Sequence, residues 1–318
     1  MMRVVFIVRQ ILAALFFTRA LVLAAGLSAV IVVALSGCAT QVKHVETKGN
    51  LAPGVKEDED FPIIDAHVHV RFSGKRNRFS LIVDSRETFL KEMADNHVVG
   101  AVAHKQFNEE WHDLKAQHVI YCPILGSVVD VKKLEAGLRE KRYSCIKVFL
   151  GYVPQYANDK RYDPAYRLAE KYHVPVVFHT GDTDDSDALL KYADPMAIDE
   201  VAVKYRKVTF VIAHLGNPWV QTAAEIVYKN DNVYADVSAF LIGDLTRKSP
   251  EDIEEYVVKP IRWAYGYVED PHKLMYGTDW PLTDMKSYIW AVKRAIPRAR
   301  WRDVFYNNAQ TVFKIPGL

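Results

Sequence analysis

Short apolar runs alternate with longer segments of helical periodicity from residue 61 to the carboxyl terminus. The apolar runs are rich in β-branched and aromatic residues, as buried strands are. Eight runs qualify, and we expect a strand in each: residues 61–70, 98–105, 119–128, 144–150, 174–181, 208–216, 232–240 and 272–281. Amphipathic segments lie between them, among them residues 85–97, 130–142, 163–173 and 249–268.

This alternation predicts a (β/α)8 TIM barrel over residues 61–318. Eight strands, each followed by helical sequence, within about 250 residues match the usual size of that fold. A doubly wound open sheet uses similar units, but no glycine-rich phosphate loop follows the first predicted strand. We therefore expect one α/β barrel domain.

The amino terminus departs from this pattern. Three arginines, no acid and an apolar run from Ala20 to Leu35 occupy the first 38 residues, as in a secretory signal. This run is short for a membrane span. We therefore predict a signal peptide over residues 1–37, with an uncleaved membrane anchor as the alternative.

The end of this run, Leu-Ser-Gly-Cys at residues 35–38, resembles a bacterial lipobox. The resemblance implies cleavage before Cys38 and attachment of lipid to that cysteine, which tethers the protein to a membrane. Residues 38–60 have few large apolar residues and no periodicity, so we expect a lipidated cysteine and a flexible tether there. Ala39, where an aspartate would retain such a protein at the inner membrane, implies the outer membrane, facing the periplasm, in a diderm source.

The three leader arginines account for the slight basicity of the chain. Of its 41 Lys and Arg residues, 38 remain beyond the leader, against 39 Asp and Glu. We therefore expect no nucleic-acid partner. Cys122 and Cys145 both lie in apolar runs, where most cysteines are inert core residues. We favour separate thiols, with a disulfide between them as the alternative.

Histidines gather at the carboxyl ends of the predicted strands, which is the catalytic end of a barrel. Those at or near strand ends are His67, His69, His104, His179 and His214. The first two alternate along one strand, so their side chains point the same way, about 6–7 Å apart, and can hold one metal ion. Asp279 ends the eighth strand, which neighbours the first in a closed barrel. It can serve as a ligand, a proton acceptor or both.

In their order along the chain, these motifs resemble the amidohydrolase superfamily. The similarity is to the amidohydrolase-related branch that includes aminocarboxymuconate-semialdehyde decarboxylase, and it extends from Phe61 to Leu318. It rests on the stretches IIDAHVHV, CIKVFLGY, VPVVFHTG, VTFVIAHLGNPW and YGTDWP. Such a resemblance implies a (β/α)8 barrel enzyme of the metal-dependent hydrolase type.

The resemblance also implies a role for each motif residue. His67, His69, His179 and Asp279 would hold one divalent metal ion, most often zinc, with a position left open for water. Metal-activated water would attack an amide, ester or lactone of a small substrate. Asp279 would take the proton of that water, and His214 would polarise the substrate carbonyl or protonate the leaving group.

Lys147 bears on the number of metal ions. Some members of the superfamily carboxylate a lysine on the fourth strand to bridge two metals, and Lys147 lies on the fourth predicted strand. In the related branch a lysine there accompanies a single ion. We therefore expect one ion, and a second, with His214 as a ligand, only if Lys147 is carboxylated. Unmodified Lys147 would instead bind a substrate carboxylate or a neighbouring acid.

Residues near the first strand add further hypotheses. Asp65 shares the inward side of the two strand histidines, so it either braces a ligand or serves as a buried structural carboxylate. The following loop, residues 71–80, carries four basic residues and no acid, which suits an anionic substrate. We take Arg71, Arg76 and Trp280 as candidate substrate contacts, and a merely solvated loop as the alternative.

Two other functions remain open. A non-oxidative decarboxylase or hydratase would use the same metal ligands. A surface lipoprotein could retain the barrel as a binding scaffold without turnover. Because every expected ligand position is filled, we favour an enzyme, and first a hydrolase.

Overall fold

The barrel predicted over residues 61–318 is present. The computed structural model describes residues 61–107, 109 and 111–318, so the predicted signal peptide and tether lie outside the described residues. Within this part, eight parallel strands form one sheet in sequence order. They are β1 (Ile63–Val68), β2 (Val98–Gln106), β3 (Val119–Leu125), β4 (Ile146–Val148), β5 (Val176–Phe178), β6 (Phe210–Ile212), β7 (Val233–Asp236) and β8 (Leu274–Met275).

The sheet closes between β1 and the segment that follows β8. The amide of Ala66 donates to the carbonyl of Tyr276 at 3.0 Å, and the amide of Asp279 donates to the carbonyl of His67 at 2.8 Å. These bonds make the first and last strands neighbours, as barrel closure requires. The predicted (β/α)8 fold is therefore confirmed.

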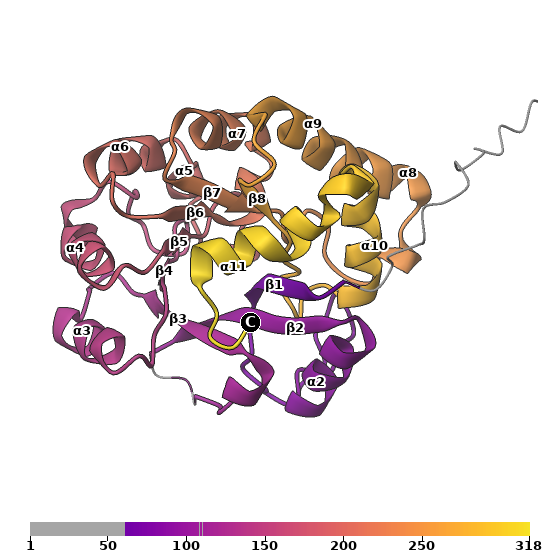
Figure 1. Ribbon diagram of the computed structural model, residues 1–318, viewed down its shortest axis with the longest axis horizontal. Helices are drawn as coiled ribbons and strands as arrows, with labels where there is room; N and C mark the ends of the chain where they lie inside the picture. The colour runs from indigo at the N-terminus through magenta and orange to yellow at the C-terminus, as the bar shows by residue number, and fades with distance from the viewer. Residues whose placement is uncertain (1–60, 108, 110) are drawn as a thin grey trace, which may run out of the picture. The chain divides into compact units, whose positions relative to one another are not determined.

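Helices surround the barrel (Figure 1). They are α2 (Arg86–Asp95), α3 (Val131–Arg139), α4 (Asp163–Tyr172), α5 (Leu190–Ala193), α6 (Ala197–Lys204), α7 (Val220–Lys229), α8 (Pro250–Ile253), α9 (Lys259–Val268), α10 (Met285–Ala295) and α11 (Asn308–Phe313). Ser249 caps α8 by accepting the amide of Asp252 at 3.0 Å, and Pro250 occupies the first turn. None of the helices in the described residues is long and apolar enough to cross a bilayer.

One connection differs from the predicted alternation. We expected helical sequence after every strand, but the described part of the link from β2 to β3 holds only a 3-10 turn, Lys115–Gln117. Leu114, just before this turn, is fully buried and belongs to the main core. A short segment thus takes the place of a helix here, and Leu114 contributes its side chain to the core.

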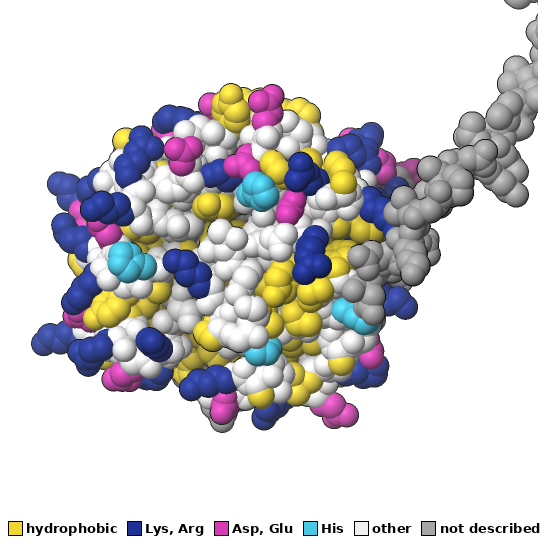
Figure 2. All heavy atoms as spheres, in the orientation of Figure 1, with side chains coloured by type: hydrophobic (Ala, Val, Ile, Leu, Met, Phe, Trp, Pro, Cys, Tyr) yellow, Lys and Arg dark blue, Asp and Glu magenta, His cyan; other side chains and the backbone are white. Residues whose placement is uncertain are grey.

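The barrel interior is closed at the end where the strands begin. Inward side chains of the strands form an apolar layer with Val312 and Phe313 of α11. Figure 2 views the face over α11, where acidic and basic side chains are interspersed around the edge. Any functional opening must therefore lie at the opposite end, where the strands finish.

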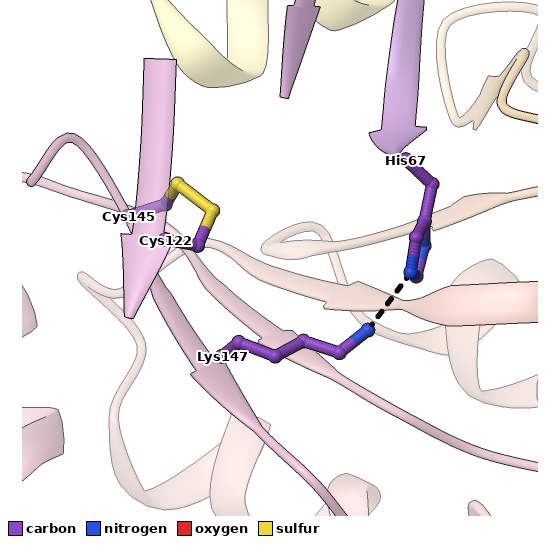
Figure 3. Close-up of a disulfide and its surroundings, with 4 residues drawn as sticks. All are labelled: His67, Cys122, Cys145 and Lys147. Atoms are coloured by element: carbon purple, nitrogen blue, oxygen red, sulfur yellow. Dashed lines mark hydrogen bonds between the residues drawn. A yellow bond between two sulfur atoms is a disulfide. The ribbon is translucent and has the colours of Figure 1, made fainter. Parts of the chain in front are cut away.

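Cys122 of β3 and Cys145, directly before β4, form a disulfide inside the barrel (Figure 3). The preference for separate thiols was wrong. The residues are 23 positions apart, and only the pairing of β3 with β4 brings their Cα atoms to 4.6 Å. Sequence composition describes the burial of each cysteine but not the distance between them.

Candidate metal centre

A cavity of about 870 Å³ opens at the carboxyl ends of the strands. His69, His179, His214 and Asp279 line it together, although they lie far apart in the sequence. His67 is fully buried beside them, with Nε2 3.7 Å from Oδ1 of Asp279. The structure thus brings the predicted metal ligands to one place. That they bind a metal stays a prediction.

Backbone geometry aims two of these side chains into the cavity. His214 and Asp279 both have positive φ, 60° and 64°, a left-handed conformation that is uncommon outside glycine and often found at functional sites. Gly277 permits the close approach of β8 to β1. A Cβ atom there would lie only 3.0 Å from Cβ of His67.

Hydrogen-bond partners assign the tautomers of the two β1 histidines. Nδ1 of His67 lies 3.0 Å from Oδ2 of Asp236, and Nδ1 of His69 lies 3.1 Å from the carbonyl oxygen of His104. Carboxylate and carbonyl oxygens only accept, so both Nδ1 atoms carry the proton. Both Nε2 atoms therefore present lone pairs. For His69 this lone pair lies 3.1 Å from Oδ1 of Asp279.

The other two histidines are arranged in the same way. Nε2 of His179 donates to the carbonyl of Asp182 at 3.0 Å. Nδ1 of His214 lies 2.9 Å from Oγ of Ser238, whose own proton goes to Oδ1 of Asp236 at 2.5 Å. The remaining nitrogens, Nδ1 of His179 and Nε2 of His214, are 3.2 Å apart. In neutral rings with these tautomers both nitrogens carry lone pairs, and a cation or an added proton between them would stabilise this arrangement.

Burial favours the neutral form of His67, His179 and His214. It lowers the pKa of His67 and His179 far below the ordinary value, and it also lowers the pKa of His214. Burial would raise the pKa of Asp279, but positive charge at His67, and a hydrogen bond from His69 when its Nε2 carries a proton, outweigh burial and hold the pKa of this carboxyl below its usual range. Neutral imidazoles and an ionised carboxylate are the donor set of a catalytic zinc-type site.

The residues thus fit a divalent cation. One ligand atom from each of His67, His69 and Asp279 lies within 4.8 Å of the others. Lys147 lies next to these residues and can donate a hydrogen bond, since its Nζ is 3.3 Å from Nε2 of His67 (Figure 3). Burial lowers the pKa of Lys147 to about 8, against the attraction of Asp236 and Asp279.

Asp65 braces the barrel seam. Its carboxylate accepts the amide and the hydroxyl of Thr278, at 3.0 and 2.5 Å, and the amide of His67 at 3.1 Å. These contacts tie β1 to the end of β8 and position the backbone of His67 rather than its ring. Burial raises the pKa of Asp65 to about 7.

We expect Asp65→Asn to remove a pH dependence from the stability of the metal-free protein. Because folding raises the pKa of Asp65 from 3.8 to about 7, its contribution is full below pH 4 and is lost as the pH rises through 7. The wild type should lose about 2–3 kcal/mol more than the variant between pH 5 and pH 8. Urea unfolding at both pH values measures this difference. Equal losses in the two proteins would contradict it.

The predicted substrate contacts divide between the cavity and the core. Arg71 and Arg76 line the cavity, where Nε of Arg71 lies 3.2 Å from Oε1 of Glu109. Trp280 instead is fully buried, with its ring centroid 4.9 Å from that of Phe89 of α2. The structure therefore places Trp280 in the core between barrel and helix, and the expected substrate contact is not supported.

Several residues of the site were missed. Asp236 ends β7, and Ser238 follows it, so the rule that polar residues at strand ends form the site would have found both. Phe149 and Tyr152 stack at 4.1 Å and present their rings to His179 at 5.2 and 4.9 Å. They form an aromatic wall of the cavity, and apolar side chains give no such signal in a sequence.

A comparison with protein families decides the relationship. The family model described as Amidohydrolase matches residues 64–315. The chain belongs to the amidohydrolase family. No curated protein matches the sequence of this amidohydrolase.

Solved structures resemble the amidohydrolase in fold. An uncharacterised TIM-barrel protein from Bordetella bronchiseptica has 19% identity and a TM-score of 0.62, covering 81% of this chain and 100% of its own. A probable 2-pyrone-4,6-dicarboxylic acid hydrolase from Acinetobacter baumannii has 16% identity and a TM-score of 0.56, with 80% and 100% covered. A 5-carboxyvanillate decarboxylase from Novosphingobium aromaticivorans, complexed with manganese and a nitrobenzoic acid, has 13% identity and a TM-score of 0.55, with 81% and 97% covered. At such identities the likeness concerns the fold.

Proposed function

We propose that this protein is a metal-dependent hydrolase in which His67, His69, His179 and Asp279 hold one divalent cation. The observation that carries the proposal is the close approach of Nε2 of His69 to Oδ1 of Asp279, at 3.1 Å, and of Nε2 of His214 to Nδ1 of His179, at 3.2 Å, on atoms that their other partners leave as acceptors. A divalent ion there would supply a Lewis acid that activates water or polarises a substrate oxygen. Zinc suits the nitrogen-rich ligands, and manganese is the ion of one structural neighbour.

Asp279 and His214 would accept and transfer the protons of the reaction. Oδ1 of Asp279 faces Nε2 of His67 and His69 and, among the described residues, has no well-aligned hydrogen bond, so it would face the cation, while the other oxygen of the carboxylate would take a proton from attacking water. His214 can receive a proton at Nε2 and pass it to the leaving group. Ser238 and Asp236, in line behind its Nδ1, would stabilise the imidazolium that forms.

The cavity favours a small anionic substrate. Lys75, Arg76 and Arg78 join Arg71 in lining it, together with the aromatic wall of Phe149 and Tyr152 and three acids, Asp84, Asp184 and Asp185. Guanidinium and ammonium groups bind carboxylates, and the aromatic faces suit a planar group. Glu109 pairs with Arg71, and Asp184 pairs with Arg78. Lys75 and Arg76 are therefore the cations best placed to bind a substrate carboxylate.

A decarboxylase using the same ligands is the second candidate. The basic loop would serve a substrate that loses a carboxylate as well as one that keeps it, and one structural neighbour is a decarboxylase. A second metal ion would require carboxylation of Lys147.

Metal analysis and substrate screening together test the function. The purified wild type should contain one equivalent of zinc or manganese and hydrolyse at least one carboxylated lactone, ester or amide. Release of carbon dioxide from carboxylated phenols or enols, without hydrolysis, would favour the decarboxylase. A wild-type protein that binds neither zinc nor manganese would refute both the hydrolase and the decarboxylase.

We also propose that lipid on Cys38 anchors the protein in the cell envelope, at the outer membrane in a diderm bacterium. The lipobox-like residues 35–38 support this, and so does the Cys122–Cys145 disulfide, because disulfides persist mainly outside the cytoplasm. Mass spectrometry of the mature amino terminus tests it. An unmodified Cys38 would exclude the anchor.

A further inference from the structure

His104 of β2 is a buried imidazole with no assigned role. It is fully buried, and among the described residues neither of its ring nitrogens has a hydrogen-bond partner. Its ring centroid lies 4.2 Å from that of His67 and 5.9 Å from that of His69. Burying an unsatisfied imidazole is costly, and an apolar ring would pack as well. The polar atoms of His104 therefore call for an explanation.

Lys147 supplies an explanation for the polar atoms of His104. Its Nζ bonds Nε2 of His67, which is the lone pair that a cation would occupy at the proposed metal site. Binding of a cation there would leave the lysine without this acceptor. A buried ammonium or amine without a partner is destabilising, so Lys147 needs a second acceptor in the metal-bound protein.

Other neighbours of Lys147 are poor candidates. Asp236 already accepts four hydrogen bonds, from Nδ1 of His67, the amide of His214, and the amide and hydroxyl of Ser238. Asp279 would be engaged by the cation itself. The inner layer beside Lys147 consists of apolar side chains and the disulfide, which accept hydrogen bonds weakly or not at all.

We propose that His104 is a positioning residue that accepts the hydrogen bond of Lys147 when a divalent cation occupies Nε2 of His67. The inference rests on the proposed metal site. His104 lies directly against His67, with ring centroids 4.2 Å apart, and Nζ of Lys147 is 3.3 Å from Nε2 of the same His67 ring, so both side chains border one imidazole. His104 also holds Nδ1 of His69 through its carbonyl, so one residue of β2 serves both β1 histidines.

Two substitutions separate a hydrogen-bonding role from ring packing. His104→Phe keeps the ring and removes the acceptor, whereas His104→Gln keeps an acceptor and removes the ring. We expect His104→Phe to weaken Zn²⁺ binding by about 10–100-fold, the usual effect of losing an outer partner of a metal site. The same variant should raise the Tm of the metal-free protein by about 2–4 °C, because an unsatisfied polar group is gone. His104→Gln should retain Zn²⁺ affinity within about threefold of the wild type.

Chelator-competition titration of Zn²⁺ into the metal-free full-length protein, with thermal unfolding of the same samples, measures both effects. His272→Phe, in an exposed turn before β8, is the matched control and should change neither. If His104→Phe bound Zn²⁺ like the wild type and His104→Gln bound it more weakly, ring packing would explain the role of His104 and the proposal would be overturned. Equal Zn²⁺ affinities in the wild type and both variants would also overturn it. Failure of the wild type itself to bind Zn²⁺ would instead refute the proposed metal site.

Discussion

Asp279→Asn is expected to lower kcat/KM by at least about 10³-fold, because it removes both a metal ligand and the proton acceptor. The amide would also donate to the lone pair on Nε2 of His69, now 3.1 Å from Oδ1 of Asp279. This new hydrogen bond would satisfy the nitrogen without a cation. Metal content and steady-state kinetics on the substrate found by screening measure both losses.

Asp284→Asn is the matched control. Asp284 caps α10 by accepting the amide of Ser287 at 2.8 Å, and asparagine caps helices nearly as well. This variant should keep full metal content and lose less than about twofold in activity. If Asp279→Asn behaved like the control, Asp279 would have no place in the reaction.

Asp236→Asn should be the second most damaging change, although Asp236 lies behind the ligands. An amide placed 3.0 Å from Nδ1 of His67 can donate to it, which would shift the ring proton to Nε2. A protonated Nε2 cannot bind a metal ion. We expect Zn²⁺ affinity to fall at least about 10–100-fold and kcat to fall with it by about 10²-fold or more.

Zinc titration measures this loss, and nitrogen NMR of the histidine rings reports the tautomer directly. Asp244→Asn, which alters an exposed cap with the same chemistry, should leave both unchanged. Wild-type affinity in Asp236→Asn, with the proton of His67 still on Nδ1, would rule out this role for Asp236.

The barrel could be predicted from the sequence because strand and helix periods are local. Each strand was placed by a few consecutive apolar residues, and each cap by residues within one turn, as Ser249 and Pro250 show for α8. The meeting of His67 with Asp279 followed from closure, which makes the first and last strands neighbours whatever lies between them.

Long-range pairs were beyond the reach of such patterns. Cys122 and Cys145 were assigned separate thiols because their strands each looked apolar, and nothing local marks two neighbouring strands as close enough for a bond. Trp280 looked like a rim residue because it follows Asp279. The left-handed turn at Asp279 aims that carboxylate into the cavity, while the Trp280 ring packs against Phe89.

The sequence by itself determined the barrel and placed the histidines and Asp279 at its open end, since both follow from spacing along single strands. Tertiary structure decided which nitrogen of each histidine carries the proton and which keeps a lone pair. Asp236 is 169 residues from His67, yet its carboxylate holds the proton on Nδ1 and turns Nε2 toward the cavity. A histidine becomes a metal ligand only through such a partner, and folding alone brings the two together.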